Sequence, residues 1–319
     1  MVARGLRKTF ADLVAVDRLD LEVRPGEIFG LVGPDGAGKT TTLRLLCGIL
    51  DPDAGDAEVG GRSVRQDPEG VKALVGYMSQ RFSLYGDLTV AENIFFFANL
   101  FHVPADERRR REQELLEASR MTPFRDRLAR NLSGGMKQKL ALTCTLIHRP
   151  QILFLDEPTT GVDPVSRRDF WKILYGLVRQ GMTLVVSTPY MDEAERCNRL
   201  AFMHQGRLLR CASPRELKQD LPGDLVEVAG APAHELAERL RGLPFVDGLQ
   251  LFGSRLHVQV ARAGESLALI GQALRQAGVQ GHTLRQIVPS LEDVFISLVR
   301  SPAGGQGFEA GAGKTEGAG

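Results

Sequence analysis

A glycine-rich segment with a lysine and two threonines, GPDGAGKTT at Gly33–Thr41, has the residue types and spacing that bind phosphate. It follows an apolar stretch, Glu27–Val32, that reads as a buried strand, and it opens a helical stretch at Lys39–Leu46. Glycines let successive backbone N–H groups curl around phosphate oxygens, and the N-terminus of the helix adds partial positive charge. The lysine then reaches the β- and γ-phosphates, and the adjacent threonine hydroxyl is suited to Mg²⁺. The segment therefore predicts binding of ATP or GTP.

A second apolar strand ends in two acids. Ile152–Leu155 is followed directly by Asp156, Glu157 and a proline. In parallel sheets, ligands bind beyond the carboxyl ends of the strands. Asp156 is therefore predicted to hold Mg²⁺, directly or through water, and Glu157 to polarise the attacking water as general base. Two solvated acids at a strand end are the alternative, and the phosphate-binding segment makes it the weaker one.

Composition and charge exclude several classes of protein. The 319 residues are 25% charged and 43% hydrophobic, as in an ordinary globular protein, and a net charge of +1 gives no reason to expect nucleic acid as a partner. Four cysteines, Cys47, Cys144, Cys197 and Cys211, lie far apart and are predicted to be reduced and mostly buried. No signal peptide is expected, and the apolar run at Asn93–Val103 is too short to cross a bilayer.

The elements that must position these residues fall into two regions. From about Val2 to Ser213, apolar strands alternate with helical stretches, which predicts an α/β fold with a parallel sheet covered on both faces. We expect this first domain at residues 1–220, with an inserted helical subdomain at about 88–145. Within the subdomain, the run Arg108–Arg111 is followed by acidic residues and is predicted to be a solvated helix face rather than a basic recognition patch.

The pattern changes near Pro222, and residues 221–300 are predicted to form a small α+β domain. The final helix should begin with a capping pattern formed by Ser290 and Asp293. Residues 301–319 are rich in Gly and Ala and have little to bury, so a disordered tail is expected there. The expected strands are Leu225–Val228, Leu256–Val260 and Thr283–Val288, and the expected helices are Glu235–Leu243, Leu267–Ala277 and Ser290–Val299.

Further motifs resemble, in order, those of the ATP-binding cassette (ABC) family. LSGGM at Leu132–Met136 is similar to the family's signature motif, and Gln80 in GYMSQ and TTGVDP at Thr159–Pro164 match other family positions. Phe10 lies at the family's adenine-stacking position, although an aromatic residue in an amphipathic strand would otherwise be interpreted as core. The resemblance implies a P-loop NTPase with an ABC-type core sheet, an inserted helical subdomain and a small C-terminal α+β domain.

The resemblance also implies that two cassettes sandwich two ATP molecules head to tail. Ser133, Gly134 and Gly135 would then bind ATP in trans, Asp163 would lie at the dimer interface, and Gln80 would link Mg²⁺ to the helical subdomain. With ATP and Mg²⁺ as cofactors, the metal-binding residues are predicted to be Thr40, Gln80 and Asp156. The residues predicted to bind ATP within the chain are Phe10, Gly33, Pro34, Asp35, Gly36, Ala37, Gly38, Lys39, Thr40 and Thr41.

One position departs from the family pattern. After the strand Thr183–Ser187 the family places a histidine that contacts the γ-phosphate, but this segment reads STPYMDEAE and the matching residue is Pro189. Proline has no N–H donor, and neither His148 nor His204 is expected to replace the histidine. Loss of one preorganised donor costs roughly 10²–10³ in rate. We therefore expect slow turnover at this chain's own site and a second, more competent cassette in a heterodimer, with a homodimer as the alternative.

The segment YMDEAERC at Tyr190–Cys197, the small C-terminal domain and its ending PSLEDVFISLV resemble bacterial exporters of drugs, lipids or polysaccharides. This implies a separate transmembrane permease, received by a groove at Arg81–Val103, and a chain held peripherally on the cytoplasmic face of the membrane. The alternative is a soluble ABC ATPase not engaged in transport, either ribosome-associated or a regulatory ATP-binding subunit. Ribosomal factors of the family usually carry two cassettes, and chromosome-organising ATPases need long coiled coils, for which no sustained heptads exist here. The transported substrate is not encoded in this chain.

Overall fold

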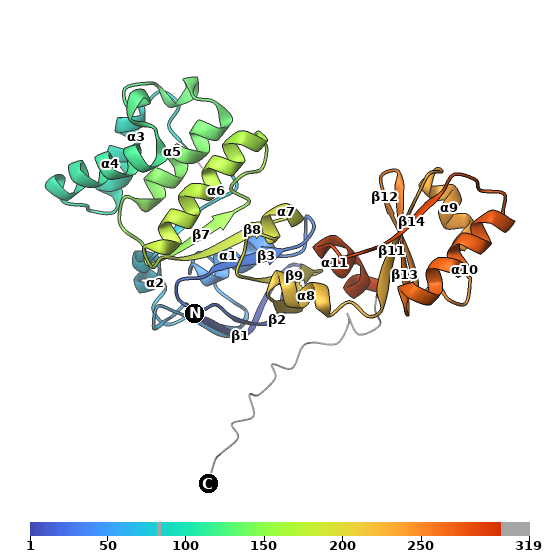
Figure 1. Ribbon diagram of the computed structural model, residues 1–319. Helices are drawn as coiled ribbons and strands as arrows, with labels where there is room; N and C mark the ends of the chain where they lie inside the picture. The colour runs from blue at the N-terminus through green and yellow to red at the C-terminus, as the bar shows by residue number, and fades with distance from the viewer. Residues whose placement is uncertain (82–83, 301–319) are drawn as a thin grey trace, which may run out of the picture. The chain divides into compact units, whose positions relative to one another are not determined.

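The computed structural model describes residues 1–81 and 84–300. The described chain forms two compact units that divide between Ala212 and Ser213 (Figure 1). The expected boundary after residue 220 falls inside the second unit, just after helix α8 (Pro214–Gln219). The tail expected at residues 301–319 lies outside the described residues.

The first unit is built on a six-stranded sheet in which five neighbouring strands run parallel and β10 pairs antiparallel at one edge. Three adjacent strands, β3, β8 and β7, are buried along their whole length, as the apolar runs in the sequence predict. In spatial order the strands are β10 (Arg207–Ala212), β9 (Arg199–His204), β3 (Ile28–Val32), β8 (Thr183–Thr188), β7 (Ile152–Asp156) and β6 (Val75–Met78).

Both faces of this sheet are covered, because successive side chains of a strand point to opposite sides. Phe154 of β7 packs in a cluster with Leu43 of α1, whereas its neighbour Leu155 packs in a second cluster with Trp171 of α6. The predicted parallel sheet with helices on both faces is therefore confirmed. The helices that cover it are α1 (Lys39–Leu46), α5 (Gly134–Leu146) and α6 (Pro164–Arg179), with the short α2 (Pro68–Leu74) and α7 (Met191–Ala194) beside them.

A four-stranded antiparallel sheet, which the sequence interpretation did not resolve, packs on the α1 side of the unit. Its residues Leu6, Val16 and Ala57 share one cluster with Leu43 of α1. The β1–β2 hairpin also passes the phosphate-binding segment, since a Cβ on Gly38 would lie 2.3 Å from the Ala15 carbonyl oxygen. Its strands, in order, are β2 (Leu13–Glu22), β1 (Val2–Phe10), β4 (Ala54–Val59) and β5 (Arg62–Ser63).

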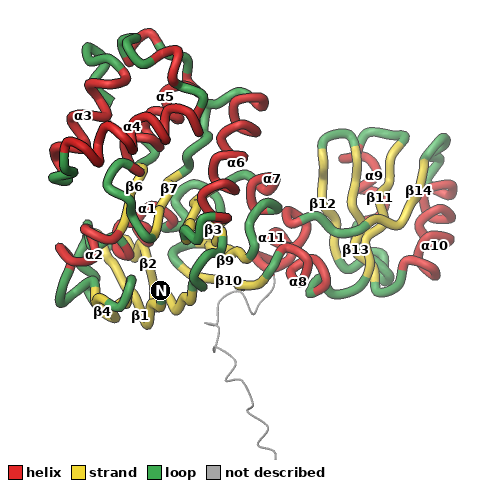
Figure 2. The backbone as a smooth tube through the Cα atoms, turned by 60° about the vertical axis from the view of Figure 1, so that its left-hand side comes forward, coloured by secondary structure: helices red, strands yellow, loops and turns green. Residues whose placement is uncertain are grey.

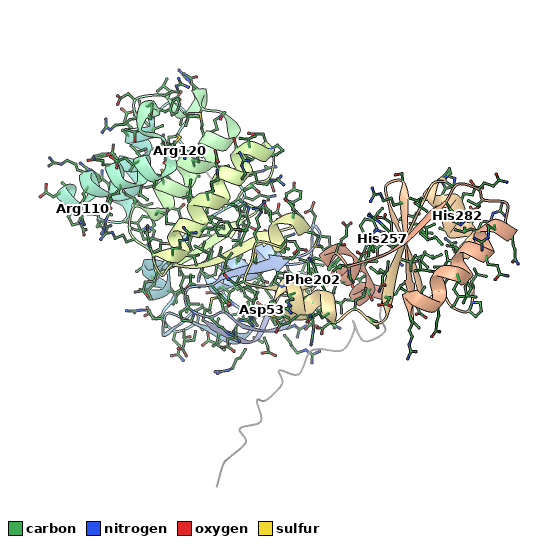
Figure 3. The ribbon with its side chains drawn as sticks, in the orientation of Figure 1. Asp53, Arg110, Arg120, Phe202, His257 and His282 are labelled. Carbon is green, nitrogen blue, oxygen red and sulfur yellow. The ribbon has the colours of Figure 1, made fainter. Side chains whose placement is uncertain are left out.

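The helical insertion has its own core, in which α3, α4 and α5 meet (Figure 2). Arg109 and Arg110 are exposed, as a solvated face requires, and Figure 3 shows Arg110 on the outer side of α4. Arg111 is different: it donates to the Ile147 carbonyl at 2.8 Å and pairs with Glu107 at 2.9 Å. The elements are α3 (Val90–Leu100), α4 (Ala105–Ser119) and the 3₁₀ turns η1 (Thr122–Phe124) and η2 (Ala129–Asn131). None of the helices in residues 1–81 and 84–300 has the length and apolarity needed to cross a membrane.

The second unit has the β-α-β-β-α-β order of a ferredoxin-like fold, with an antiparallel sheet in the order β12-β13-β11-β14. Helices α9 and α10 cover one face. On the other face His257 of β13, labelled in Figure 3, contacts Asp293 of α11 at 2.8 Å. The predicted Ser290–Asp293 capping pattern is confirmed, because each backbone N–H donates to the other's side chain. The elements are β11 (Asp224–Ala229), α9 (Ala233–Leu240), β12 (Gly248–Phe252), β13 (Arg255–Val260), α10 (Ala263–Gln276), β14 (Thr283–Ile287) and α11 (Leu291–Arg300).

Candidate functional site

The phosphate-binding segment joins β3 to α1 at the carboxyl edge of the parallel sheet, as predicted. Gly36 and Gly38 have φ angles of +77° and +99°, a region that L side chains rarely adopt. At Gly33 a Cβ would lie 2.2 Å from the Met203 carbonyl oxygen of β9. These glycines are therefore required both by backbone conformation and by close packing, while Pro34 and Asp35 are exposed.

Lys39, the first residue of α1, is buried beneath this loop. Its ammonium donates to the carbonyl oxygens of Gly33 at 2.9 Å and Pro34 at 3.0 Å, and it lies 3.4 Å from Glu157 Oε1. An ammonium has three protons to donate, and in this arrangement two go to the loop carbonyls and the third faces a carboxylate. A bound phosphate would therefore compete with Glu157 for Lys39.

Asp156 lies next to the first turn of α1, so that its carboxylate and the Thr40 hydroxyl could bind the same cation. Thr40 Oγ1 is 3.1 Å from Asp156 Oδ1, and Ser187 and Tyr77 also donate to this carboxylate, at 2.6 and 3.1 Å. Burial raises the pKa of Tyr77 to about 12, so the phenol remains a donor at neutral pH.

The oxygen ligands gathered here fit a Mg²⁺ ion. Hydroxyl, carboxylate and amide oxygens are the hard donors that this cation prefers. The described residues contain no group of three or more His, Cys, Asp or Glu side chains suited to a metal. A cation would accordingly rely on Thr40 and Asp156, with Gln80 nearby, and on oxygens of the nucleotide and water.

Glu157 follows the strand in a left-handed backbone conformation, with φ of +48°. For a residue other than glycine this costs roughly 1–2 kcal/mol, and such strain gathers at functional sites. Its backbone N–H is fixed by the Ser187 carbonyl at 3.1 Å and by the Ser187 hydroxyl at 3.0 Å. Its Oε2 accepts from Gln80 Nε2 at 2.8 Å, so the structure joins the segment after β6 to the candidate general base.

Pro189 lies between the phosphate loop and Glu157. It follows β8, which is paired with β3 on one side and β7 on the other. The Gly33 N–H donates to the Thr188 carbonyl at 3.4 Å. Pro189 itself offers no N–H.

The two nearest histidines in sequence do not occupy this position. His148 Nε2 lies 3.0 Å from the carbonyl of Val75, the first residue of β6, so it is at the opposite edge of the sheet. Its ring stacks on Phe101 at 3.9 Å, and burial lowers its pKa. His204 is the last residue of β9, and in the turn that follows the Gly206 N–H donates to the Ala37 carbonyl of the phosphate-binding segment.

The signature residues and Asp163 are not brought to the chain's own phosphate loop. Ser133 and Gly134 are exposed at the start of α5, where Ser133 accepts from the Met136 N–H at 3.3 Å. Gly135 is buried, and a Cβ there would lie 2.5 Å from Ser166 Cβ, so α5 needs glycine to approach α6. Asp163 is the N-cap of α6; hydrogen bonds from Ser166 and Val165 hold its pKa below the usual value.

Phe10 ends β1 and is 45% exposed, so the structure does not place it in the core. The Lys8 ammonium lies 5.7 Å from its ring centroid. The site also holds residues that the sequence interpretation missed. Tyr77 and Ser187 fix Asp156, and only the register of β6, β7 and β8 shows that these side chains share one edge.

Comparison with known proteins decides the family. Residues 16–160 match the ABC transporter family model, and residues 213–299 match the model of the DrrA1-3-like ATP-binding protein C-terminal domain. The chain is 35% identical over 297 residues to the daunorubicin resistance ATP-binding protein DrrA3 of Streptomyces coeruleorubidus, covering 92% of this chain and 94% of that one. The chain belongs to the ATP-binding proteins of ABC transporters.

Other ABC proteins show the same relationship. The chain is 38% identical to the Nod factor export ATP-binding protein I of Cupriavidus metallidurans, over 92% of this chain and 95% of that one. It is 40% identical to the probable multidrug ABC transporter ATP-binding protein YbhF of Escherichia coli K12, over 92% of this chain but only 51% of YbhF. The chain thus spans about half the length of that relative.

Solved ABC structures show the same fold. One, described as the structure of the ATP binding subunit of an ABC transporter, has a TM-score of 0.65 at 21% identity and covers 94% of this chain and 99% of that one. The dimeric, post-hydrolysis cassette MJ0796 bound to ADP and Pi has a TM-score of 0.61 at 24% identity, over 66% of this chain and 97% of that one.

Proposed function

We propose that this ABC protein binds ATP with Mg²⁺ and hydrolyses it to power a separate transmembrane permease that exports a drug, lipid or other small molecule. The observation that carries the proposal is the meeting of Lys39, Asp156 and Glu157 at one sheet edge, with Gln80 hydrogen-bonded to Glu157. Export is favoured because the relatives named above are multidrug, daunorubicin resistance and Nod factor export proteins, and because the chain shares their C-terminal domain.

Within one chain, the roles follow from position. The backbone of Gly33–Gly38 and the ammonium of Lys39 bind the phosphates, while Thr40, Asp156 and Gln80 supply ligands to Mg²⁺. The exposed ring of Phe10 stacks on adenine. Glu157 acts as general base once a phosphate has displaced its carboxylate from Lys39. The backbone conformation of Gly36 and Gly38 and the contacts of Lys39 and Thr40 support the assignments for phosphate and Mg²⁺.

A second cassette completes each site. We infer that Ser133, Gly134 and Gly135 contact the terminal phosphate of ATP held by the partner, and that Asp163 lies at the interface. In support, Ser133, Gly134 and Asp163 are exposed, and the hydrogen bonds of Ser133 and Asp163 stay within α5 and α6. Because Pro189 supplies no donor, we propose that this chain's own site is slow and that the partner is a different cassette, with a homodimer as the alternative.

The permease is proposed to dock on the helical insertion, which would hold the chain on the cytoplasmic face of the membrane. Four large apolar side chains of α3 and its end are exposed, and Tyr85 lies 4.6 Å from one of their rings, as measured between centroids. A cavity of about 380 Å³ nearby is lined in part by Gln80, which donates a hydrogen bond to Glu157. A permease helix docked in this cavity would contact Gln80 and would thus be separated from Glu157 by a single side chain. The exposed side chains are Phe95, Phe96, Leu100 and Phe101.

Purification of the tagged full-length chain from membranes in mild detergent, with mass spectrometry of the bound proteins, tests the proposal. Recovery of a polytopic permease and a second cassette is expected. A permease with only this chain would keep export but overturn the heterodimer. Recovery from the soluble fraction, with ribosomes or alone, would overturn transport in favour of a ribosome-associated or regulatory ABC ATPase.

A paired variant sharpens the experiment. Leu100→Asp on α3 should abolish recovery of the permease without loss of ATP binding, because it puts a charge on the exposed apolar face. The matched control is Leu251→Asp, which changes an equally exposed leucine in the second unit. Equal loss of the permease in both variants would contradict docking on α3.

A further inference from the structure

A second buried carboxylate, outside the nucleotide site, collects donors from three segments of the first unit. Glu193 lies in the short helix α7 and is 1% exposed. A carboxylate is buried at great cost unless hydrogen bonds and charges compensate it. Its carboxylate therefore needs hydrogen-bond donors, and these come from segments that also carry residues of the proposed ATPase site.

The donors come from the segment after β7, the end of β8 and helix α6. Glu193 Oε1 accepts from the Thr159 hydroxyl and from Trp171 Nε1 at 3.4 Å, and Arg167 Nε lies 3.7 Å away. The other oxygen, Oε2, accepts from the Thr188 hydroxyl at 2.7 Å. One side chain thus links the segment after β7, the end of β8 and helix α6, in addition to the pairing of β7 with β8 in the sheet.

Each tied segment leads directly to a residue of the proposed site. Thr159 stands two residues after Glu157, and its carbonyl accepts from the Val162 N–H at 3.1 Å on the way to Asp163. Thr188 directly precedes Pro189 and accepts from the Tyr190 N–H at 3.1 Å.

Helix α6 reinforces the same connection from its own side. The Arg167 guanidinium lies 4.7 Å from the centroid of the Tyr190 ring, and it lies 3.6 Å from Asp192. Because Asp163 is the N-cap of α6, that helix links Asp163 to Arg167 and, through Arg167, to the segment that follows Pro189.

We propose that Glu193 is a positioning residue for ATP hydrolysis: its carboxylate fixes the Thr159 segment against the Thr188 segment, so that docking of the partner cassette at Asp163 sets the position of Glu157. This connection adds to the hydrogen bonds from Ser187 and Gln80 that hold Glu157. The inference rests on the proposed function, in which Asp163 lies at the cassette interface.

The fluorescence of Trp171 can report on changes around Glu193. Trp171 is the single tryptophan of the sequence, and its indole N–H donates to Glu193. Indole emission responds to a charged acceptor, so nucleotide-driven movement of the cluster should change the fluorescence of the isolated full-length chain. Glu193→Gln removes the charge and should abolish most of that ATP-induced change.

The main test compares Glu193→Gln with Glu195→Gln, an exposed position two residues further along the same turn. In the complex with permease and second cassette, Glu193→Gln should lower kcat about tenfold and leave KM and the equilibrium affinity for ATP within twofold. Glu195→Gln should leave all three unchanged. Glu193→Asp, which keeps the charge, should recover part of kcat.

A double-mutant cycle locates the effect. If Glu193 acts through the Thr159–Asp163 segment, Glu193→Gln should lower kcat by less than twofold in an Asp163→Ala background. Full additivity would overturn the proposal, as would an unchanged kcat or a parallel loss of ATP affinity and thermal stability, which marks a merely structural residue. A wild-type complex without ATPase activity would instead overturn the proposed function, while the Trp171 response to ATP still decides the role of Glu193.

Discussion

Replacing Pro189 by histidine is expected to raise the rate of ATP hydrolysis at this chain's own site. The residue follows β8, and its neighbours are fixed on both sides: the Gly33 N–H donates to Thr188, and the Glu157 N–H donates to Ser187. The backbone at position 189 follows the strand that lies between β3 and β7, so a histidine side chain here would extend from a point between the phosphate-binding segment and Glu157. The turn does not need the proline, because the Tyr190 N–H is already held by the Thr188 hydroxyl at 3.1 Å.

The size of the gain follows from what one preorganised donor is worth. Donors aimed at developing charge contribute about 10²–10³ in rate, or roughly 2.7–4 kcal/mol of barrier. Glu157, Lys39 and Asp156 are already in place, so an added donor would act on an otherwise assembled site. We expect the rate of hydrolysis to rise about tenfold or more. A rise of about 10²–10³ requires that the introduced histidine point at the terminal phosphate as well as the family's own histidine does.

The assay is steady-state phosphate release by the purified complex, with the second cassette inactivated at its own phosphate-loop lysine so that only this site is counted. Pro189→Ala removes the ring without adding a donor and should leave the rate near that of the wild type. Glu157→Gln combined with Pro189→His should return the rate to background. A gain of twofold or less from Pro189→His, or an equal gain from Pro189→Ala, would refute the reasoning.

Three further outcomes are expected. Glu157→Gln should lower hydrolysis at least a hundredfold yet keep or strengthen ATP binding, measured by equilibrium dialysis, because it removes the carboxylate that competes for the buried lysine; weaker binding would contradict this. Gly135→Ala should destabilise the chain by about 1–3 kcal/mol in urea unfolding, since its Cβ would lie 2.5 Å from Ser166 Cβ, and Ser166→Gly should restore part of the loss. Although burial raises the pKa of Asp293, hydrogen bonds from His257 and Ser290 outweigh it and hold the pKa below its usual value. The stabilisation is then present above about pH 4 and lost as pH falls through the lowered pKa, so Asp293→Asn should be less stable than wild type at pH 6, and the difference should shrink as the pH falls below about 4.

The sequence determined the parts of the molecule whose information is local. Apolar runs without alternation predicted the buried strands at Ile152 and Thr183, and Gly33–Thr41 predicted a loop between a strand and a helix; the structure confirms both. Burial of Cys47, Cys144 and Cys197 was also predicted correctly. In each case the deciding property, hydrophobicity or backbone freedom, belongs to residues that are neighbours in the chain.

Other features needed the pairing of distant segments. The antiparallel sheet of β1, β2, β4 and β5 was not resolved: two of its pairs are local hairpins, but the sheet is joined only by the pairing of β1 with β4, which is distant in the chain. Strand β12 was missed for a different reason: its residues are mostly half-buried and show no alternation, although its partner β13 follows directly in a hairpin. The run at Arg108 looked uniformly solvated, yet Arg111 turns inward to a carbonyl of α5's end, which no local pattern encodes.

The site divides in the same way. Residue types and spacing by themselves identified Lys39, Asp156 and Glu157, since phosphate and Mg²⁺ chemistry leaves few choices of side chain. Only the tertiary structure decided that Gln80 touches Glu157 across 77 residues of chain, and that Glu193 collects donors from three segments. Contacts of this kind arise where neighbouring strands end at one edge of a sheet, and their order in the sheet differs from their order in the sequence.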